Sequence, residues 1–196
     1  FKLALTHSTG LRNPTLYEFY GTDNYGIQGN KSLNPEKSEN NEISGEYEII
    51  NNMIFKMTAY RAKIFDQIET NSAYTKHENE LINLNQEGLE SKLVYKKKNN
   101  NLSIFSNFSK SEKINNQTQN RRPEITFGLN YTRKFLTSST GPFNLNLNYK
   151  YTGKYNDWTG SKNEFVKSTD IIGISISKNL SGNIFSLKIS NLLDEN

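Results

Sequence analysis

Apolar and polar residues alternate with a period of two along several segments of this chain. In the clearest segment, Phe143–Tyr151, the residues Phe, Leu and Tyr alternate with Asn and Lys. In a β-strand this alternation places apolar side chains on one face and polar side chains on the other. The same pattern predicts strands at Glu42–Ile49, Leu89–Lys96, Ile125–Thr132 and Phe185–Ser190.

Four further segments alternate less regularly and complete a predicted antiparallel sheet. They are Phe1–Ser8, Met53–Ile68, Leu102–Phe108 and Ile171–Ser177. Both faces of the second segment carry apolar residues, so the pattern does not assign which face points outward. The alternation of the third changes phase near Ile104–Phe105, which suggests a β-bulge. Together these segments predict about nine strands and no helix.

The connections between the predicted strands alternate between short and long. The short ones are polar and lie at Asn51–Asn52, Lys98–Asn101, Ser138–Gly141 and Leu180–Gly182. The long ones lie at Thr9–Asn34, Asn71–Asn79, Ile114–Asn120 and Trp158–Val166. Short periplasmic turns and long extracellular loops are typical of bacterial outer-membrane β-barrels. We therefore expect the long set to lie outside the cell, and we expect the apolar faces of Ile125–Tyr131 and Phe143–Tyr149 to meet lipid.

The composition agrees with a β-barrel in a membrane better than with a compact soluble core. Of the 196 residues 34% are hydrophobic and the mean hydropathy is −0.76, yet aromatic residues make up 12%. In a barrel only every second residue meets lipid, so the average hydropathy stays low. No apolar run is long enough for a transmembrane helix. The charge of +4 is spread along the chain, so no nucleic-acid partner is expected.

The sequence offers no pattern of an enzyme, a metal site or a cofactor site. It contains no nucleophile elbow, phosphate loop or zinc-protease motif, and it has no Cys. The two histidines, His7 and His77, lie far apart in the sequence. Catalytic residues, metal ligands and cofactors are therefore all predicted to be none. The carboxylates Glu42, Glu46 and Glu48 share a strand face, where we expect them to be solvated in the lumen and paired with Lys92 or Lys96.

Two boxes between Gly10 and Ser38 organise the chain. The first reads L-R-N-P-T-L-Y-E-F-Y-G and the second G-N-K-S-L-N-P-E-K-S. They resemble the paired signature of TonB-dependent outer-membrane receptors, F-R-A-P-x-L-x-E-L-Y and G-N-P-x-L-x-P-E-K-S. This chain departs from the signature at Leu11 and Asn13, and at Lys31 and Ser32. The segments Leu81–Glu90 and Asn191–Asn196 resemble later strands of the same family.

The resemblance implies an all-β fold, a transmembrane antiparallel β-barrel. Residues 1–196 would be the C-terminal portion of a barrel of about twenty-two strands, without the plug domain and the TonB box. The implied function is TonB-energised uptake of a scarce nutrient across the outer membrane of a Gram-negative bacterium. The implied partners are the lipid bilayer, an extracellular nutrient and the TonB complex, reached through the plug region.

Among the branches of the family, the compact loops resemble the cobalamin receptors most, with ferric siderophore receptors as the alternative. A rival of another class is a soluble all-β binding module, whose apolar face would pack on a second sheet.

The loop between the boxes carries the candidate ligand-binding residues. Its aromatic rings would offer flat apolar surface to a large organic ligand, and its polar side chains would supply hydrogen bonds. Aromatic residues also concentrate at membrane interfaces, which leaves a second role open for them. No His lies between Pro14 and Leu33, so haem ligation through this loop is not expected. The candidates are Asn13, Tyr17, Tyr20, Asp23, Asn24, Tyr25 and Gln28.

Overall fold

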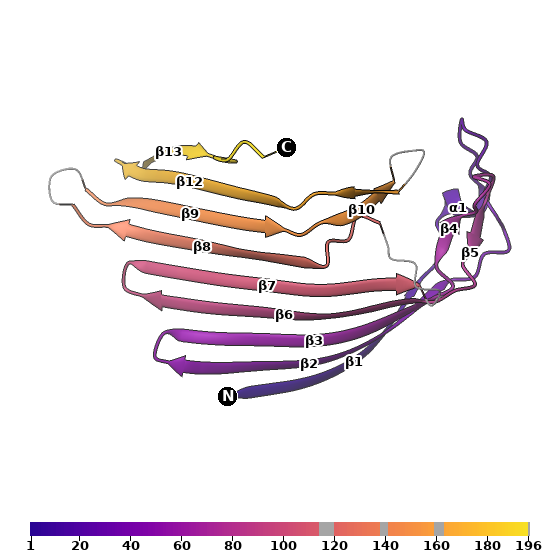
Figure 1. Ribbon diagram of the computed structural model, residues 1–196, viewed down its shortest axis with the longest axis horizontal. Coiled ribbons are helices and arrows are strands. Elements are labelled where there is room, and N and C mark those ends of the chain that lie inside the picture. Colours follow the sequence, from indigo (N-terminus) through magenta and orange to yellow (C-terminus); the bar gives the residue numbers. More distant parts are fainter. Residues whose placement is uncertain (114–119, 138–140, 159–162, 196) are drawn as a thin grey trace.

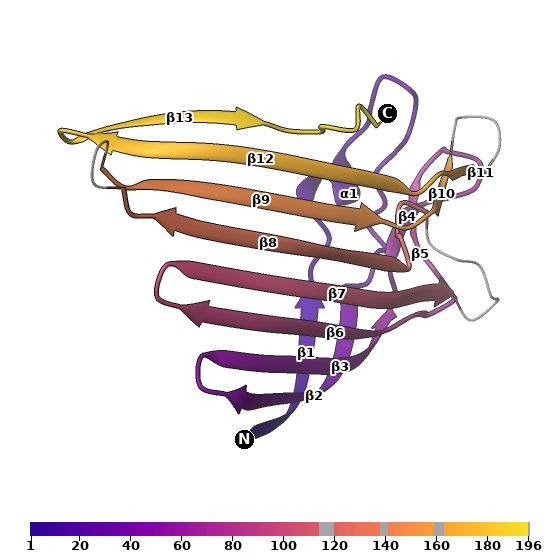
Figure 2. The same ribbon diagram turned by 60° about the vertical axis from the view of Figure 1, so that its left-hand side comes forward.

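The structure, a computed structural model, describes residues 1–113, 120–137, 141–158 and 163–195. Its main element is a nine-stranded antiparallel sheet in the order β1-β2-β3-β6-β7-β8-β9-β12-β13. The sheet is curved, with β1 to β3 sweeping away from the direction of β8 to β12 (Figures 1 and 2). Its strands are β1 (Lys2–Arg12), β2 (Glu36–Ile50), β3 (Met53–Phe65), β6 (Leu84–Lys97), β7 (Asn100–Lys113), β8 (Ile125–Phe135), β9 (Phe143–Thr152), β12 (Thr169–Leu180) and β13 (Asn183–Ile189).

The pairing register joins the apolar residues of all nine strands into one band on one face. Residues paired across an antiparallel ladder lie on the same face. One row of partners runs Leu5, Ile43, Ala59, Leu89, Phe108 and Ile125. A second row runs Leu102, Tyr131, Leu147, Ile174 and Ile189. The predicted strands and the fold class are therefore confirmed.

No second sheet covers this apolar face within the described part of the chain. The other two sheets, β4 (Ile68–Thr70) with β5 (His77–Asn79) and β10 (Tyr155–Trp158) with β11 (Asn163–Val166), have two strands each. They lie at the long-loop end of the strands (Figure 1). The buried hydrophobic residues of the described chain are Leu33, Ile68 and Leu84. In the rival module, a soluble sandwich, a second sheet would cover this face.

The register also resolves the strand whose outward face was open. In β3, Phe55 pairs with Tyr47 and Leu93, which places it on the apolar face. Met57 and Ala59 follow on the same face, while Ile54 and Ile64 lie on the polar one.

The expected bulge near Ile104–Phe105 is wrong. Strand β7 pairs with β6 and β8 without a register shift, and the irregularity lies in β2, between Glu48 and Ile50. Phe105 is instead an aromatic residue on the polar face, directly opposite Gly128. A Cβ added to Gly128 would lie 2.6 Å from the Phe105 ring and 2.6 Å from the Tyr149 carbonyl oxygen. The glycine therefore makes room for the ring.

Replacing Gly128 by Ala should destabilise the barrel by about 1–2 kcal/mol, because the new methyl group overpacks this contact. Gly45→Ala is the matched control, since a Cβ there meets its nearest atom only at 3.9 Å. Urea unfolding of the full-length protein in detergent would measure both variants. Equal midpoints for the two would contradict the packing role of Gly128.

The connections follow the predicted alternation of short turns and long loops. Tight turns with positive φ at Asn52, Lys98 and Ser181 join strands at one end. The loops at the other end hold β4, β5, β10, β11 and one helix, α1 (Leu16–Tyr20). Parts of three expected connections lie outside the described residues: 114–119 of the loop Ile114–Asn120, 138–140 of the turn Ser138–Gly141 and 159–162 of the loop Trp158–Val166.

The helix α1 was not predicted. Thr15 caps it, because its hydroxyl accepts the Glu18 amide while the Glu18 carboxylate accepts the Thr15 amide, a capping box. The structure contains, in its described part, no helix long and apolar enough to cross a membrane.

Candidate functional site

The long loops after β1 and β3 fold into one unit, here named the loop platform and defined as residues 13–35 and 66–83. The Gln28 amide donates to the Thr75 carbonyl at 2.8 Å, and the His77 amide donates to the Gln28 carbonyl at 3.2 Å. The Asn30 side chain donates to the His77 carbonyl at 2.9 Å. The ring of Tyr17 meets the ring of His77 edge to face, with centroids 5.6 Å apart. Two loops distant in sequence thus form one continuous surface.

Asn79 joins the platform at its base. Its side-chain oxygen accepts the Asn34 amide at 2.7 Å, and its side-chain nitrogen donates to the carbonyls of Asn34 at 3.0 Å and Asp66 at 2.7 Å. The buried hydrophobic residues Leu33 and Ile68 belong to the same two loops, and Leu84 follows directly at the start of β6. An amide side chain that pairs with the backbone in this way fixes the entry of a loop. The Asn-Pro step of the second box therefore starts β2 from a fixed point.

A charged cluster, here named the rim clamp, ties the platform to the sheet. It consists of Arg12 at the end of β1, Glu18 in α1 and Glu36 at the start of β2. The Arg12 guanidinium donates to both Glu36 oxygens, at 2.6 and 2.7 Å, and to Glu18 at 3.1 Å. Glu36 also accepts the Ile68 amide at 2.7 Å. The conspicuous Arg and Glu residues of the two boxes thus meet in space and hold the loops together.

The rim clamp shifts the protonation of its members. Hydrogen bonds from Arg12 lower the pKa of Glu36, and burial offsets part of that effect. Burial raises the pKa of Glu18, but hydrogen bonds from Thr15 and Arg12 outweigh it and leave that pKa below its usual value. The hydrogen bond to Glu36 raises the pKa of Arg12. All three groups are therefore charged at neutral pH.

Acid should loosen the platform. A carboxylate whose pKa is lower in the folded protein stabilises it above the unfolded pKa, about 4.3 for Glu. That stability is lost as the pH falls through the folded value. After correction for the intrinsic pH dependence of amide exchange, the protection of residues 13–35 should thus fall below about pH 4. A Glu36→Gln variant should exchange faster at neutral pH and respond less to acid; an unchanged acid response would contradict this.

The platform carries the seven predicted ligand-binding residues, and the structure places them differently. Tyr20 and Tyr25 are exposed, at 64% and 92%, and Tyr17 is half-exposed against His77. Asn13 and Asn24 are exposed as well. The Asp23 carboxylate accepts the amides of Tyr25 at 2.9 Å and Ile27 at 2.8 Å, so it shapes its own turn. The backbone of Gln28 binds the second loop, and its side chain is exposed.

The second loop was not predicted from the sequence to be part of this surface. Tyr74 and Leu81 there are exposed, and Leu16 of α1 adds a further exposed apolar side chain at the same end. Tyr74 has a positive φ of 55°, an unusual backbone for an aromatic residue and one that can mark a functional turn. The residues between Asn71 and Asn79 give no motif in the sequence. Their role as a partner of the first loop emerges only from the pairing.

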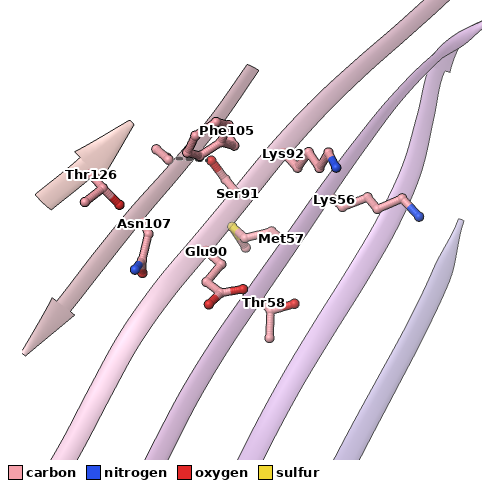
Figure 3. A pocket seen from close by; sticks show the side chains of 10 residues that line it. Lys56, Met57, Thr58, Glu90, Ser91, Lys92, Phe105, Asn107 and Thr126 are labelled. Atoms are coloured by element: carbon pink, nitrogen blue, oxygen red, sulfur yellow. Dashed lines mark hydrogen bonds between the residues drawn. The ribbon is translucent and has the colours of Figure 1, made fainter. Parts of the chain in front are cut away.

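The polar face of the sheet holds a second feature, a groove of about 470 Å³ (Figure 3). Lys56 and Lys92 are register partners and extend side by side across its wall, with Thr58 and Glu90 in the next row. Phe105 and Asn107 of β7 continue the lining. A second groove, lined by Asn40, Glu42, Tyr60 and Gln86, lies farther toward the loop end. The polar wall therefore offers both charges and hydrogen-bonding groups along its length.

The carboxylates of β2 lie on this polar face, as expected, but their pairing differs from the prediction. Glu46 binds Lys56 at 2.7 Å and Lys2 at 3.2 Å, rather than Lys92 or Lys96. The register explains the difference, because Glu46 stands between Lys2 and Lys56 while Lys92 is one strand farther. Within the described ranges, no group of three or more His, Asp or Glu residues is arranged to hold a metal ion.

Several solved structures have the same fold. The siderophore receptor PirA from Acinetobacter baumannii has a TM-score of 0.79 and 17% identity, with 98% of this chain and 35% of that chain covered. The FrpB iron transporter from Neisseria meningitidis has a TM-score of 0.73 and 13% identity, covering 98% and 32%. FpvA of P. aeruginosa, bound to heterologous pyoverdines, has a TM-score of 0.72 and 14% identity, covering 98% and 27%.

The chain spans about a third of the length of these structures. A comparison with the sequences of curated proteins gives no match. A family model described as "TonB dependent receptor-like, beta-barrel" matches residues 1–192, almost the whole chain. The match agrees with the nine-stranded sheet, the alternating connections and the clamp made from the two boxes. The chain belongs to the TonB-dependent receptor β-barrel family.

Proposed function

We propose that this chain is part of an outer-membrane receptor that takes up a ferric siderophore with energy from the TonB complex. The observation that carries the proposal is the loop platform. It presents exposed tyrosines at one end of the polar face of the sheet, and the rim clamp fixes it to the strands β1 and β2. A site that binds its ligand tightly also holds it back from release into the cell. A ligand with equal affinity for the capturing and the releasing conformation does not shift the equilibrium between them. Coupling to an energised partner resolves that conflict. Catalysis has no part in this role.

The choice of ligand rests on two observations. The platform offers flat apolar surface in Tyr17, Tyr20 and Tyr25 beside the polar side chains Asn13 and Asn24, a combination suited to a large organic chelate. Two of the solved structures with the same fold are named as a siderophore receptor and as an iron transporter. We therefore propose a ferric siderophore as the ligand in preference to cobalamin. Uptake of cobalamin stays a prediction that no specific observation favours.

Binding to the purified intact receptor tests the ligand class. Ferric catecholate, ferric hydroxamate and a corrinoid would be titrated separately by fluorescence quenching. We expect saturable binding of a ferric chelate, and we expect it to weaken at least tenfold when Tyr17, Tyr20 and Tyr25 are all replaced by Ser. Tyr47→Leu, on the apolar face of β2, is the control and should bind as the unaltered receptor does. Saturable binding of the corrinoid alone would overturn the choice.

Single cysteines test the proposed orientation in the outer membrane. A cysteine in place of Asn24, on the platform, should react with an impermeant thiol reagent added to whole cells. A cysteine in place of Asn52, in the turn between β2 and β3, should react only after the cells are lysed. Labelling of the second variant on whole cells would invert the proposed topology.

A further inference from the structure

A hollow of about 480 Å³ lies on the apolar-face side of the sheet, between the ends of β8 and β9 and the β10–β11 hairpin. Ile125 and Tyr151 form its floor, and both belong to the apolar band. Gly153 continues the wall, and its amide donates to the Ile125 carbonyl at 2.8 Å. Phe165 of β11 lines the hollow as well. The hollow thus sits where the apolar band ends and the loops begin.

Two lysines flank this apolar floor. Lys154 and Lys167 line the hollow, one just before β10 and the other just after β11. The Lys154 ammonium lies 5.6 Å from the centroid of the Phe165 ring. Neither lysine forms an ion pair with another residue that the structure describes, and Glu124 is the one carboxylate in the lining. An apolar floor with two lysines in the lining of the same hollow matches an amphiphile with a negative head group.

We propose that this hollow binds a phosphorylated lipid of the outer leaflet. Its acyl chain would lie along Ile125 and Tyr151, continuing the lipid layer that covers the apolar band, and its phosphate would lie between Lys154 and Lys167. A free phosphate ion would gain nothing from the apolar floor, whereas an uncharged lipid would gain nothing from the lysines. The inference rests on the proposed membrane location, but it does not depend on which nutrient the receptor takes up.

Native mass spectrometry of the purified intact receptor tests the inference. The receptor would be mixed with bis-phosphorylated lipid A or with phosphatidylcholine, and retained lipid would be counted. We expect selective retention of lipid A, which should fall at least fivefold when Lys154 and Lys167 are both replaced by Gln. The matched control replaces Lys150 and Lys188, which lie on the polar face of β9 and β13, and should retain lipid A as the unaltered receptor does.

Three outcomes would overturn the inference: equal retention of the two lipids, an unchanged count in the Lys154/Lys167 variant, or the same loss in the control. A Phe165→Ser variant adds an independent reading, since it removes apolar surface and leaves both lysines in place. It should lower retention of lipid A as well. If the unaltered receptor retained lipid A but bound no ferric chelate, the result would contradict the proposed function and still support the lipid site.

Discussion

A receptor in which Leu147 is replaced by Arg should lose roughly 2–4 kcal/mol of stability, the cost of a cation on the lipid face near the bilayer midplane. Leu147 lies in the middle of β9, and its partners on both sides, Tyr131 and Ile174, belong to the apolar band. The arginine would therefore have no polar neighbour on its own face at that depth. Equilibrium urea unfolding in lipid vesicles would give the free energies.

Asn148→Arg is the matched control for this experiment. Asn148 is the next residue of β9, at nearly the same depth, but it is exposed on the polar face opposite Asn130 and Gly173. An arginine there would remain in water, so a loss of about 0.5 kcal/mol or less is expected. Equal losses for the two variants would show that the apolar band does not meet lipid.

Replacing Arg12 by Gln should release the loop platform from the sheet. Hydrogen bonds to charged groups contribute about 1.5–3 kcal/mol when buried, and the 43% exposure of the Arg12 side chain reduces that contribution through solvent screening. We therefore expect a local loss of about 2 kcal/mol, which corresponds to roughly thirtyfold faster hydrogen exchange in residues 13–35. Ligand affinity should fall as well, because the freed loops must be ordered again on binding.

The control for the Arg12 variant is Lys2→Gln, which removes the pair between Lys2 and Glu46 at the other end of β1. The Lys2 side chain is 81% exposed, so its loss should leave exchange in the platform unchanged. Exchange in the strands β6 to β9 should stay the same in both variants. An Arg12→Gln receptor with normal exchange in residues 13–35 would show that other contacts hold the loops.

The strands could be predicted from the sequence because each one repeats a local pattern. The alternation in Phe143–Tyr151 needs no knowledge of the rest of the chain, and β9 confirms it. The pattern failed at Phe105, where an aromatic side chain on the polar face is accommodated by Gly128 on another strand. The helix α1 was missed, although Thr15 and Glu18 have the spacing of a capping box and could have revealed it.

The candidate site was predictable only in part, since its geometry depends on contacts between distant segments. The boxes indicated where the platform begins and ends, but the meeting of Arg12 with Glu36 required the β1–β2 register. The second loop joins through Asn79, which no motif marks. The role of Asp23 in its own turn could have been predicted from the sequence. A short polar side chain followed closely by a glycine, here Gly26, is typical of a turn. Its part in ligand binding, like that of the other six residues, stays a prediction.

The order of the strands in the main sheet has a consequence for how the chain acquires its structure. Every strand lies beside the strands that precede and follow it among the nine, with no crossover. Each ladder can therefore close as soon as the next strand has arrived, and the average separation of contacting residues stays small for a β-protein. Assembly can proceed one hairpin at a time from either neighbour. The gain or loss of one hairpin would change the number of strands in the sheet by two and leave the pairing of the other strands intact.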